Sequence, residues 1–400
     1  MDTHTESELH NDAIILSELE RRFYLYLIGG DYEKLFYTIE SNPVVEEQKA
    51  SETISVSRIL LESEVTQQQR LAQVCAGYAD PGYKSKLDTL LAKRINDRLE
   101  NEDDLLATCS QFKDLQPILI SFGKDNEFND AVFQKIEAIP WLVAQIKRFA
   151  NNPEFQPILN LPQTNDVRAI LKKLGYSLFI WLIPRFISEI LHSNTHVSLR
   201  PLVARMRQYG RLTSGAIASL VVEEPADLQD KWMTYVLAGI NIIPLFLLIN
   251  LVNVELKKLL EEQLFLFKDV REDNSDKLSV IENYHFSSDL LRDVLSLEEI
   301  LKPHILEDIG FEYFDPLPYL LGYADHTTPL ADIFFQARAY AFYRQLFKTG
   351  RIQPQETAIF LRKHRIDKSM LYKLNKYDLT STASHITLHQ ELIQRHLPEN

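Results

Sequence analysis

Histidine and acidic side chains are the groups in this sequence that could hold a catalytic metal ion. His304 precedes Glu307 and Asp308 at a spacing that places a histidine and a carboxylate on one helix face. Asp325 directly precedes His326 and makes a second acid–histidine pair. Both arrangements are more typical of a surface helix face or a helix cap than of metal ligands. We therefore do not expect either to be a metal site.

A third histidine pair has the spacing of ligands on one helix turn. His192 and His196 lie four residues apart in the segment "HSNTH". Ser, Asn and Thr side chains compete with the backbone for helical hydrogen bonds, so the segment favours a solvated loop. No histidine in the chain is followed directly by aspartate.

Nucleotide, hydrolase and redox motifs are missing from the sequence. It contains no GxxxxGK[ST], GxGxxG, GxSxG, CxxC or HExxH. Cys75 and Cys109 are the only cysteines, which allows at most one disulfide and no cysteine-based metal cluster. The polar N-terminus has no apolar segment of the signal-peptide type, so we expect a cytoplasmic protein. We expect no cofactor.

Composition favours an all-α protein with more than one domain. A chain of 400 residues exceeds the usual size of one core, and only 12 residues are glycine. Helix-period patterns recur between breaks rich in Asn, Asp, Pro and Ser. We predict an acidic helical N-terminal module (1–112), a helical domain (113–350) and a short basic tail (351–400). In the N-terminal module we expect helices on both sides of Gly29-Gly30. In the tail we expect two short basic helices and a frayed end.

One apolar stretch raises the alternative of a membrane span. Met233 to Val254 carries no charged residue and would reach about 33 Å as a helix. It contains three asparagines and Pro244, and no second clean span accompanies it, since Arg185 interrupts the next best run, "YSLFIWLIPRF". A helix buried inside a large domain is also apolar on all sides, so we expect a core helix and no membrane span.

Two segments of the central region resemble the HDOD family, which comprises non-catalytic, all-helical relatives of the HD-domain phosphohydrolases. The resemblance covers roughly 115–350 and is spread over many positions. The residues that correspond are Ile136, Pro140, Leu142, Ile146, Ala150 and Asn151, followed by Val167, Ala169, Ile170, Leu174 and Gly175. Ile139 departs from the pattern, because the family commonly has an acid there. The resemblance implies an HD-like multi-helix bundle.

The resemblance also implies a role. Active HD phosphohydrolases bind metal through an adjacent His-Asp pair, and Ile242 and Ile243 stand at the corresponding, degenerate positions. Neither side chain can ligate a cation. The resemblance therefore implies a bacterial signalling or regulatory protein without enzyme activity. The alternative is a divergent metal-dependent phosphohydrolase of the HD superfamily, for which His304 and His326 are the residues to test. Its expected partners are other signalling proteins or further copies of the chain, and it would act by protein–protein contact.

The sequence of the same region predicts where helices begin and end. Pro140 suits the first turn of a helix, Asp166 can cap a helix over 167–174, and Gly175 can end that helix in the left-handed conformation. Val167, Ile170, Leu171 and Leu174 would then share its buried face.

The C-terminal region carries an unusual density of positive charge in an acidic chain. Residues 338–376 hold ten Lys or Arg and two acids, whereas the whole chain has a net charge of −13. Two short helices would meet near Asp367, which could cap the second. The candidate interaction surface is Arg362, Lys363, Arg365, Lys368, Lys373 and Lys376. The basic segment 356–377 could bind DNA or RNA, or dock against acids of the same chain. The negative charge of the rest of the chain disfavours nucleic acid.

Overall fold

The computed structural model describes residues 6–28, 80–100, 110–120, 127–160, 164–189, 195–267, 274–309, 319 and 329–396. Five predictions lie outside these residues: the break at Gly29-Gly30, the two cysteines, His192 and the Asp325-His326 pair.

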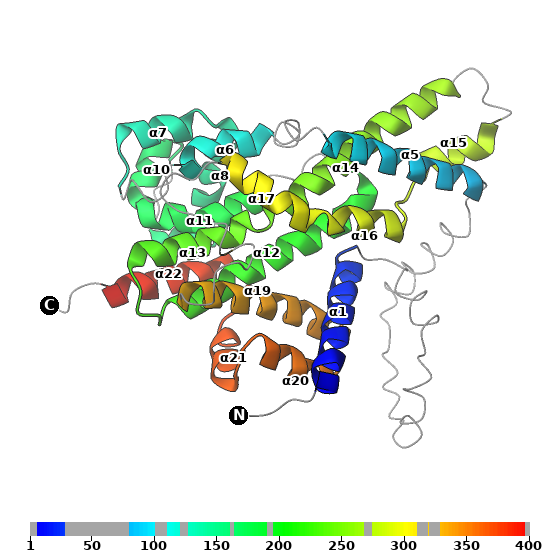
Figure 1. Ribbon diagram of the computed structural model, residues 1–400. Coiled ribbons are helices and arrows are strands. Elements are labelled where there is room, and N and C mark those ends of the chain that lie inside the picture. Colours follow the sequence, from blue (N-terminus) through cyan, green and yellow to red (C-terminus); the bar gives the residue numbers. More distant parts are fainter. Residues whose placement is uncertain are drawn as a thin grey trace.

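Every regular element that the structure describes is a helix, which confirms the all-α prediction (Figure 1). The helices fall into the order α1 (Glu6–Ile28), α5 (Pro81–Leu99), α6 (Ser110–Ile120), α7 (Asp130–Glu137), α8 (Pro140–Ala150), α9 (Gln156–Leu159), α10 (Val167–Leu174), α11 (Tyr176–Glu189), η2 (Val197–Leu199), α12 (Arg200–Val221), α13 (Leu228–Ile240), α14 (Ile243–Leu266), α15 (Ser275–Glu282), α16 (Ser288–Ser296), α17 (Glu298–Ile309), α19 (Pro329–Lys348), α20 (Pro354–Lys363), α21 (Lys368–Leu374) and α22 (Thr382–His396).

Helix α12 lies at the centre of the bundle. It packs against α11, α13, α19, α21, α22 and α1. Residues 212–221 are all buried, as expected of a helix surrounded on every side. Glycines permit the closest approaches: a Cβ on Gly210 would lie 2.7 Å from Ile242 Cδ1, and Gly215 faces the start of α22. These six helices are therefore arranged around α12.

Helices from the first and last predicted segments pack onto the central one. Helix α1 contacts α12, α16, α19 and α20. Arg22 Nη1 forms an ion pair with Glu356 Oε2 at 2.9 Å, and the Tyr26 hydroxyl donates to Gln345 Oε1 at 2.6 Å. Buried residues from Leu19 to Leu392 form one hydrophobic core. The division at residues 112 and 350 stays a prediction, and helices on both sides of each boundary touch.

The apolar stretch expected as one core helix forms two helices, α13 and α14. The chain turns at Asn241-Ile242, and Pro244 lies in the first turn of α14, where its missing N–H is tolerated. In an uninterrupted helix the proline ring would clash with the carbonyl of Ile240. Taken together, α13 and α14 (Leu228–Leu266) are long and apolar enough to cross a membrane. Of the most apolar part of this span, 94% is buried inside the fold. The absence of a membrane span stays a prediction.

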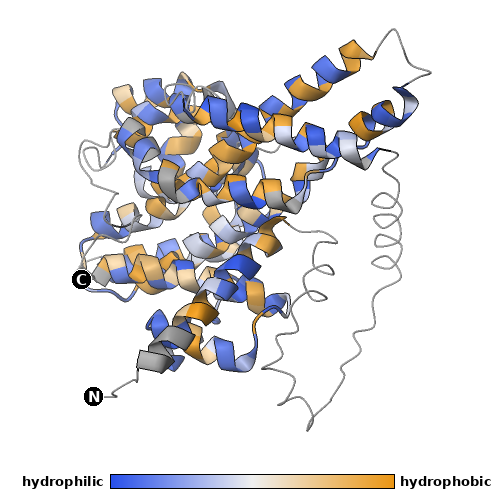
Figure 2. Ribbon diagram, turned by 45° about the vertical axis from the view of Figure 1, so that its right-hand side comes forward, coloured by the Kyte–Doolittle hydropathy of each residue, from blue (hydrophilic) through white to orange (hydrophobic). Residues whose placement is uncertain are grey.

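The C-terminal half of α14 projects from the bundle together with α5 and α15 (Figure 1). Arg98 and Glu255 pair across α5 and α14 at 3.4 Å. Apolar residues continue to the end of α14 (Figure 2), where Phe265 is 75% and Leu266 65% exposed.

The predicted caps form, with one difference in backbone conformation. Asp166 Oδ1 accepts from the backbone N–H groups of Arg168 at 3.0 Å and Ala169 at 3.3 Å. Pro140 occupies the first turn of α8, and Asp367 caps α21 by accepting from Met370 N at 2.7 Å. Gly175 ends α10 at φ 77° and ψ 156°. Its φ is positive as expected, but its ψ is extended rather than left-handed helical.

The frayed C-terminal end was a wrong prediction. Residues 382–396 form α22, which packs against α11 and α12 and buries His385, Ile386, Leu388, His389 and Leu392. Two of these buried positions are histidines, which weakens the apolar period in the sequence. The physical reason is that His385 can be buried because it accepts from the Tyr235 hydroxyl of α13 and donates to the Leu379 carbonyl in the preceding turn, and only the tertiary structure brings these groups together.

We predict that Gly215→Ala destabilises the fold by about 1–3 kcal/mol, because the new methyl group would overlap the Leu379 backbone and lie 2.6 Å from His385 Nε2. Urea unfolding measures the change. Gly82→Ala is the control: Gly82 is exposed, and its Cβ would meet only Asp80 Oδ1 at 3.4 Å. Equal unfolding midpoints for the two variants would contradict the packing of α22 on α12.

Candidate functional site

The two isoleucines that the family resemblance predicts at degenerate metal positions lie in the core. Ile242 is 1% and Ile243 0% exposed, at the junction of α13 and α14. Ile242 packs closely against Gly210 of α12. Within the described residues, no group of three or more His, Cys, Asp or Glu is placed to hold a metal ion. The junction is filled with aliphatic side chains that provide no ligand atoms.

The other histidine candidates that the structure describes lie apart from this junction. His196 precedes the short helix η2, and its Nδ1 is 2.7 Å from Ser198 Oγ. Burial lowers the pKa of His196, and the neighbouring His285 lowers it further. His304 and Glu307 are both exposed on α17, as expected of a surface helix face.

The basic residues near the C-terminus are largely engaged with acids of the same chain. Arg362 pairs with Asp12 of α1 at 3.1 Å, and Arg365 pairs with Asp332 of α19 at 3.8 Å. Lys373 pairs with Glu223, which follows α12. These three contacts help to fix α20 and α21 on the bundle. They match the alternative in which the positive charge docks intramolecularly.

One face of α21 remains turned to solvent. Lys368 and Tyr372 lie four residues apart, so they share a side of the helix. Tyr372 is 79% exposed, whereas Leu374 on the opposite side is 1% exposed. We call Lys368 and Tyr372 the α21 face. Lys363, at the end of α20, is also exposed.

The structure reveals an arginine cluster that was not predicted as a site. Arg207 and Arg211 project from successive turns of α12, and both reach Glu189 Oε1 at the end of α11, at 2.6 and 2.8 Å. Arg185 lies one turn before Glu189. The only signal in the sequence was a charge inside an apolar run. Three positive charges thus surround one acid, and the Nε of Arg207 is buried without a hydrogen-bond partner among the described residues.

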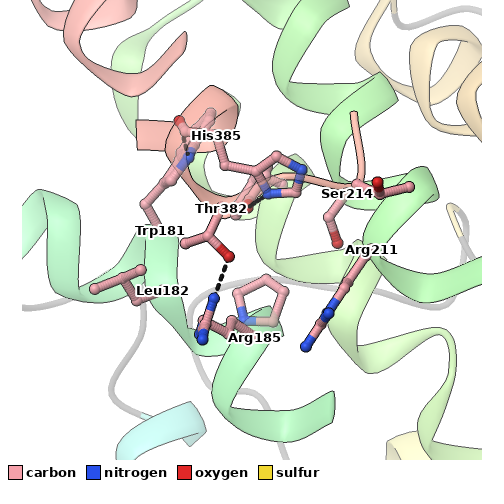
Figure 3. Close-up of a pocket in the computed structure, with 10 residues that line it drawn as sticks. Trp181, Leu182, Arg185, Arg211, Ser214, Thr382 and His385 are labelled. Atoms are coloured by element: carbon pink, nitrogen blue, oxygen red, sulfur yellow. Dashed lines mark hydrogen bonds between the residues drawn. The ribbon is translucent and has the colours of Figure 1, made fainter. Parts of the chain in front are cut away.

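Arg185 has few partners for a half-buried cation. Its Nη1 donates to the hydroxyl of Thr382, the first residue of α22 (Figure 3). No acid within the described part of the chain lies within ion-pair distance of it. Its guanidinium lies 5.9 Å from the ring centre of Phe149 and 5.4 Å from that of Phe155. Burial lowers the pKa of Arg185, and the charge of Glu189 opposes that shift.

Beside Arg185, a small pocket is lined by His385, a neutral histidine whose two ring nitrogens are both hydrogen-bonded (Figure 3). His385 Nε2 lies 2.7 Å from the Leu379 carbonyl, which can only accept, so this nitrogen carries the proton. Its Nδ1 then accepts from the Tyr235 hydroxyl at 2.9 Å. Tyr235 stacks on Trp181 at 3.7 Å, and the Trp181 indole donates to the His385 carbonyl at 2.9 Å. Burial lowers the pKa of His385 to about 4.

This arrangement provides hydrogen-bond donors and positive charge. The imidazole of His385 uses both nitrogens in structural hydrogen bonds, whereas the guanidinium of Arg185 retains unused N–H groups. Such groups suit anion binding through charge-assisted hydrogen bonds.

No protein-family model, curated protein or solved structure matches this chain. The resemblance to the HDOD family therefore stays a prediction.

We predict that stability falls as pH falls from about 6.5 to about 4. Burial lowers the pKa of both His385 and His389 to about 4, so in this range the unfolded chain binds protons that the folded chain does not. Each histidine would remove roughly 3 kcal/mol of stability across the range. The measurement is the free energy of unfolding in urea against pH. His389→Gln should flatten that slope, and an unchanged slope would contradict the prediction.

We predict that purified protein carries no stoichiometric divalent metal, because isoleucines fill the junction of α13 and α14. Elemental analysis of the intact chain provides the measurement. Stoichiometric metal, together with phosphoesterase activity that is lost in His304→Ala, would support the enzyme alternative instead.

Proposed function

We propose that this chain is a non-catalytic regulatory protein that acts by protein–protein contact through the α21 face. The observation that carries the proposal is Tyr372, which is 79% exposed beside Lys368 on a helix whose opposite side is buried. Tyrosine is one of the residue types that dominate binding at protein interfaces, and the charge of the neighbouring lysine selects a partner surface of opposite charge. The partner would present an acidic surface to Lys368.

A protein partner fits this surface better than a nucleic acid. Ion pairs to Asp12, Asp332 and Glu223 neutralise Arg362, Arg365 and Lys373, so few cations on α20 and α21 are left for phosphates. Nucleic-acid affinity grows with the number of phosphates neutralised. The net charge of −13 adds long-range repulsion.

The HDOD resemblance is consistent with the same role. In that family a helical core without metal ligands serves as an interaction module, and the resemblance assigns the buried Ile242 and Ile243 to the corresponding positions. A bacterial signalling role and a cytoplasmic location are part of this proposal and rest on the resemblance.

The test is affinity capture from native extract with the intact chain and with the double variant Lys368→Glu/Tyr372→Ala. We expect at least one protein to be captured by the unmodified chain and lost with the double variant, since charge and aromatic contact are both removed. Mass spectrometry identifies it, and binding of the purified pair is then measured by calorimetry.

Lys86→Glu is the matched control, because Lys86 is exposed on α5 and the charge change is the same. It should retain the partner. Capture of the same proteins by all three chains, or of none by any, would overturn the proposal.

A further inference from the structure

A pocket of about 250 Å³ opens beside the arginine cluster, between α8 and α11. Arg148 and Gln145 line it from α8, Asn152 from the turn that follows, and Arg185 and Glu189 from α11. Drug-sized ligands occupy pockets of roughly 300–1,000 Å³, so this pocket suits a smaller molecule. It is nevertheless several times larger than the roughly 30 Å³ that one water molecule occupies.

The charge of this pocket is positive. Two guanidinium groups, Arg148 and Arg185, face one carboxylate, Glu189. Oxygen Oε1 of that carboxylate is already held by Arg207 at 2.6 Å and Arg211 at 2.8 Å, from outside the pocket. Glu189 is therefore neutralised by α12. The charge of the exposed Glu154 also acts on Arg185, but among the described residues Glu154 forms no ion pair with Arg185 or Arg148, so the pocket keeps an excess of positive charge.

The polar groups of the pocket are donors without partners. Arg185 uses one N–H, toward Thr382. Asn152 accepts at Oδ1 from Glu154 N at 2.9 Å, which leaves its NH₂ group. In the described part of the chain, Arg148 and Gln145 make no hydrogen bond or ion pair. A half-buried guanidinium without an anionic partner is unfavourable, and an oxyanion supplies only acceptors.

We propose that this pocket binds a small oxyanion, namely the phosphate or carboxylate group of a small molecule. Arg185 and Arg148 hold the anion through charge-assisted hydrogen bonds, and the amides of Gln145 and Asn152 donate further bonds. Phe149 forms an apolar wall and keeps the Arg185 guanidinium in place, 5.9 Å from its ring centre. This binding site is independent of the α21 face.

Titration of the intact protein with inorganic phosphate, and separately with succinate, tests the proposal. Thermal unfolding is followed up to about 20 mM anion, against sodium chloride of equal ionic strength, because a ligand that binds the folded state raises the melting temperature. We expect at least one of the two anions to raise it above the chloride control. Calorimetry then gives the dissociation constants, and the tighter anion identifies the class of the natural ligand.

Variants assign the binding to this pocket. Arg148 is exposed, so Arg148→Gln should fold normally and bind about tenfold more weakly, as expected for the loss of one charge-assisted bond. Arg185→Gln should reduce affinity further. Lys147→Gln is the matched control: it removes the same charge from the neighbouring residue of α8, which does not line the pocket.

Weaker binding in either arginine variant with unchanged binding in Lys147→Gln supports the pocket. Absence of any binding beyond the chloride effect, or equal affinity in all four proteins, overturns it. Arg148→Gln keeps the test decisive even if Arg185→Gln fails to fold, because Arg148 contributes no buried contact.

Discussion

The burial of α12 on all sides is the constraint on which the rest of the fold depends. Its second half, residues 212–221, has no exposed position, so α11, α13, α19 and α22 must all find apolar or small residues to pack against. Gly210 and Gly215 let neighbouring segments of the chain approach α12 at points where a larger side chain would overlap them. The arginines of α12 all precede this buried half, and two of them, Arg207 and Arg211, meet Glu189 near the middle of the helix.

The arginine cluster follows from that constraint. Glu189, at the end of α11, compensates two arginines of α12, and Arg185, one turn earlier, forms no ion pair with an acid in the described part of the chain. Aromatic rings and the Thr382 hydroxyl satisfy it only in part. The same packing that makes the interior apolar thus creates a cationic pocket at its edge.

Much of the local structure was predictable because its causes are local. Asp166 and Asp367 cap helices through hydrogen bonds to residues two or three positions along, and Pro140 sets the first turn of its own helix. The break between α13 and α14 has an equally local cause in Pro244, yet we expected one helix there because the run is apolar throughout. Helix α22 was missed because His385 and His389 read as polar in sequence.

The sequence by itself determined that this protein is helical, where many of its helices begin, and that Ile242 and Ile243 provide no metal ligands. It also identified the basic character of α20 and α21. Only the tertiary structure decided that Arg362, Arg365 and Lys373 pair with Asp12, Asp332 and Glu223, and that Arg185 stands beside Arg207 and Arg211. The physical reason is separation along the chain: periodicity and caps act within a few residues, whereas charge neutralisation and pocket formation join residues tens to hundreds of positions apart.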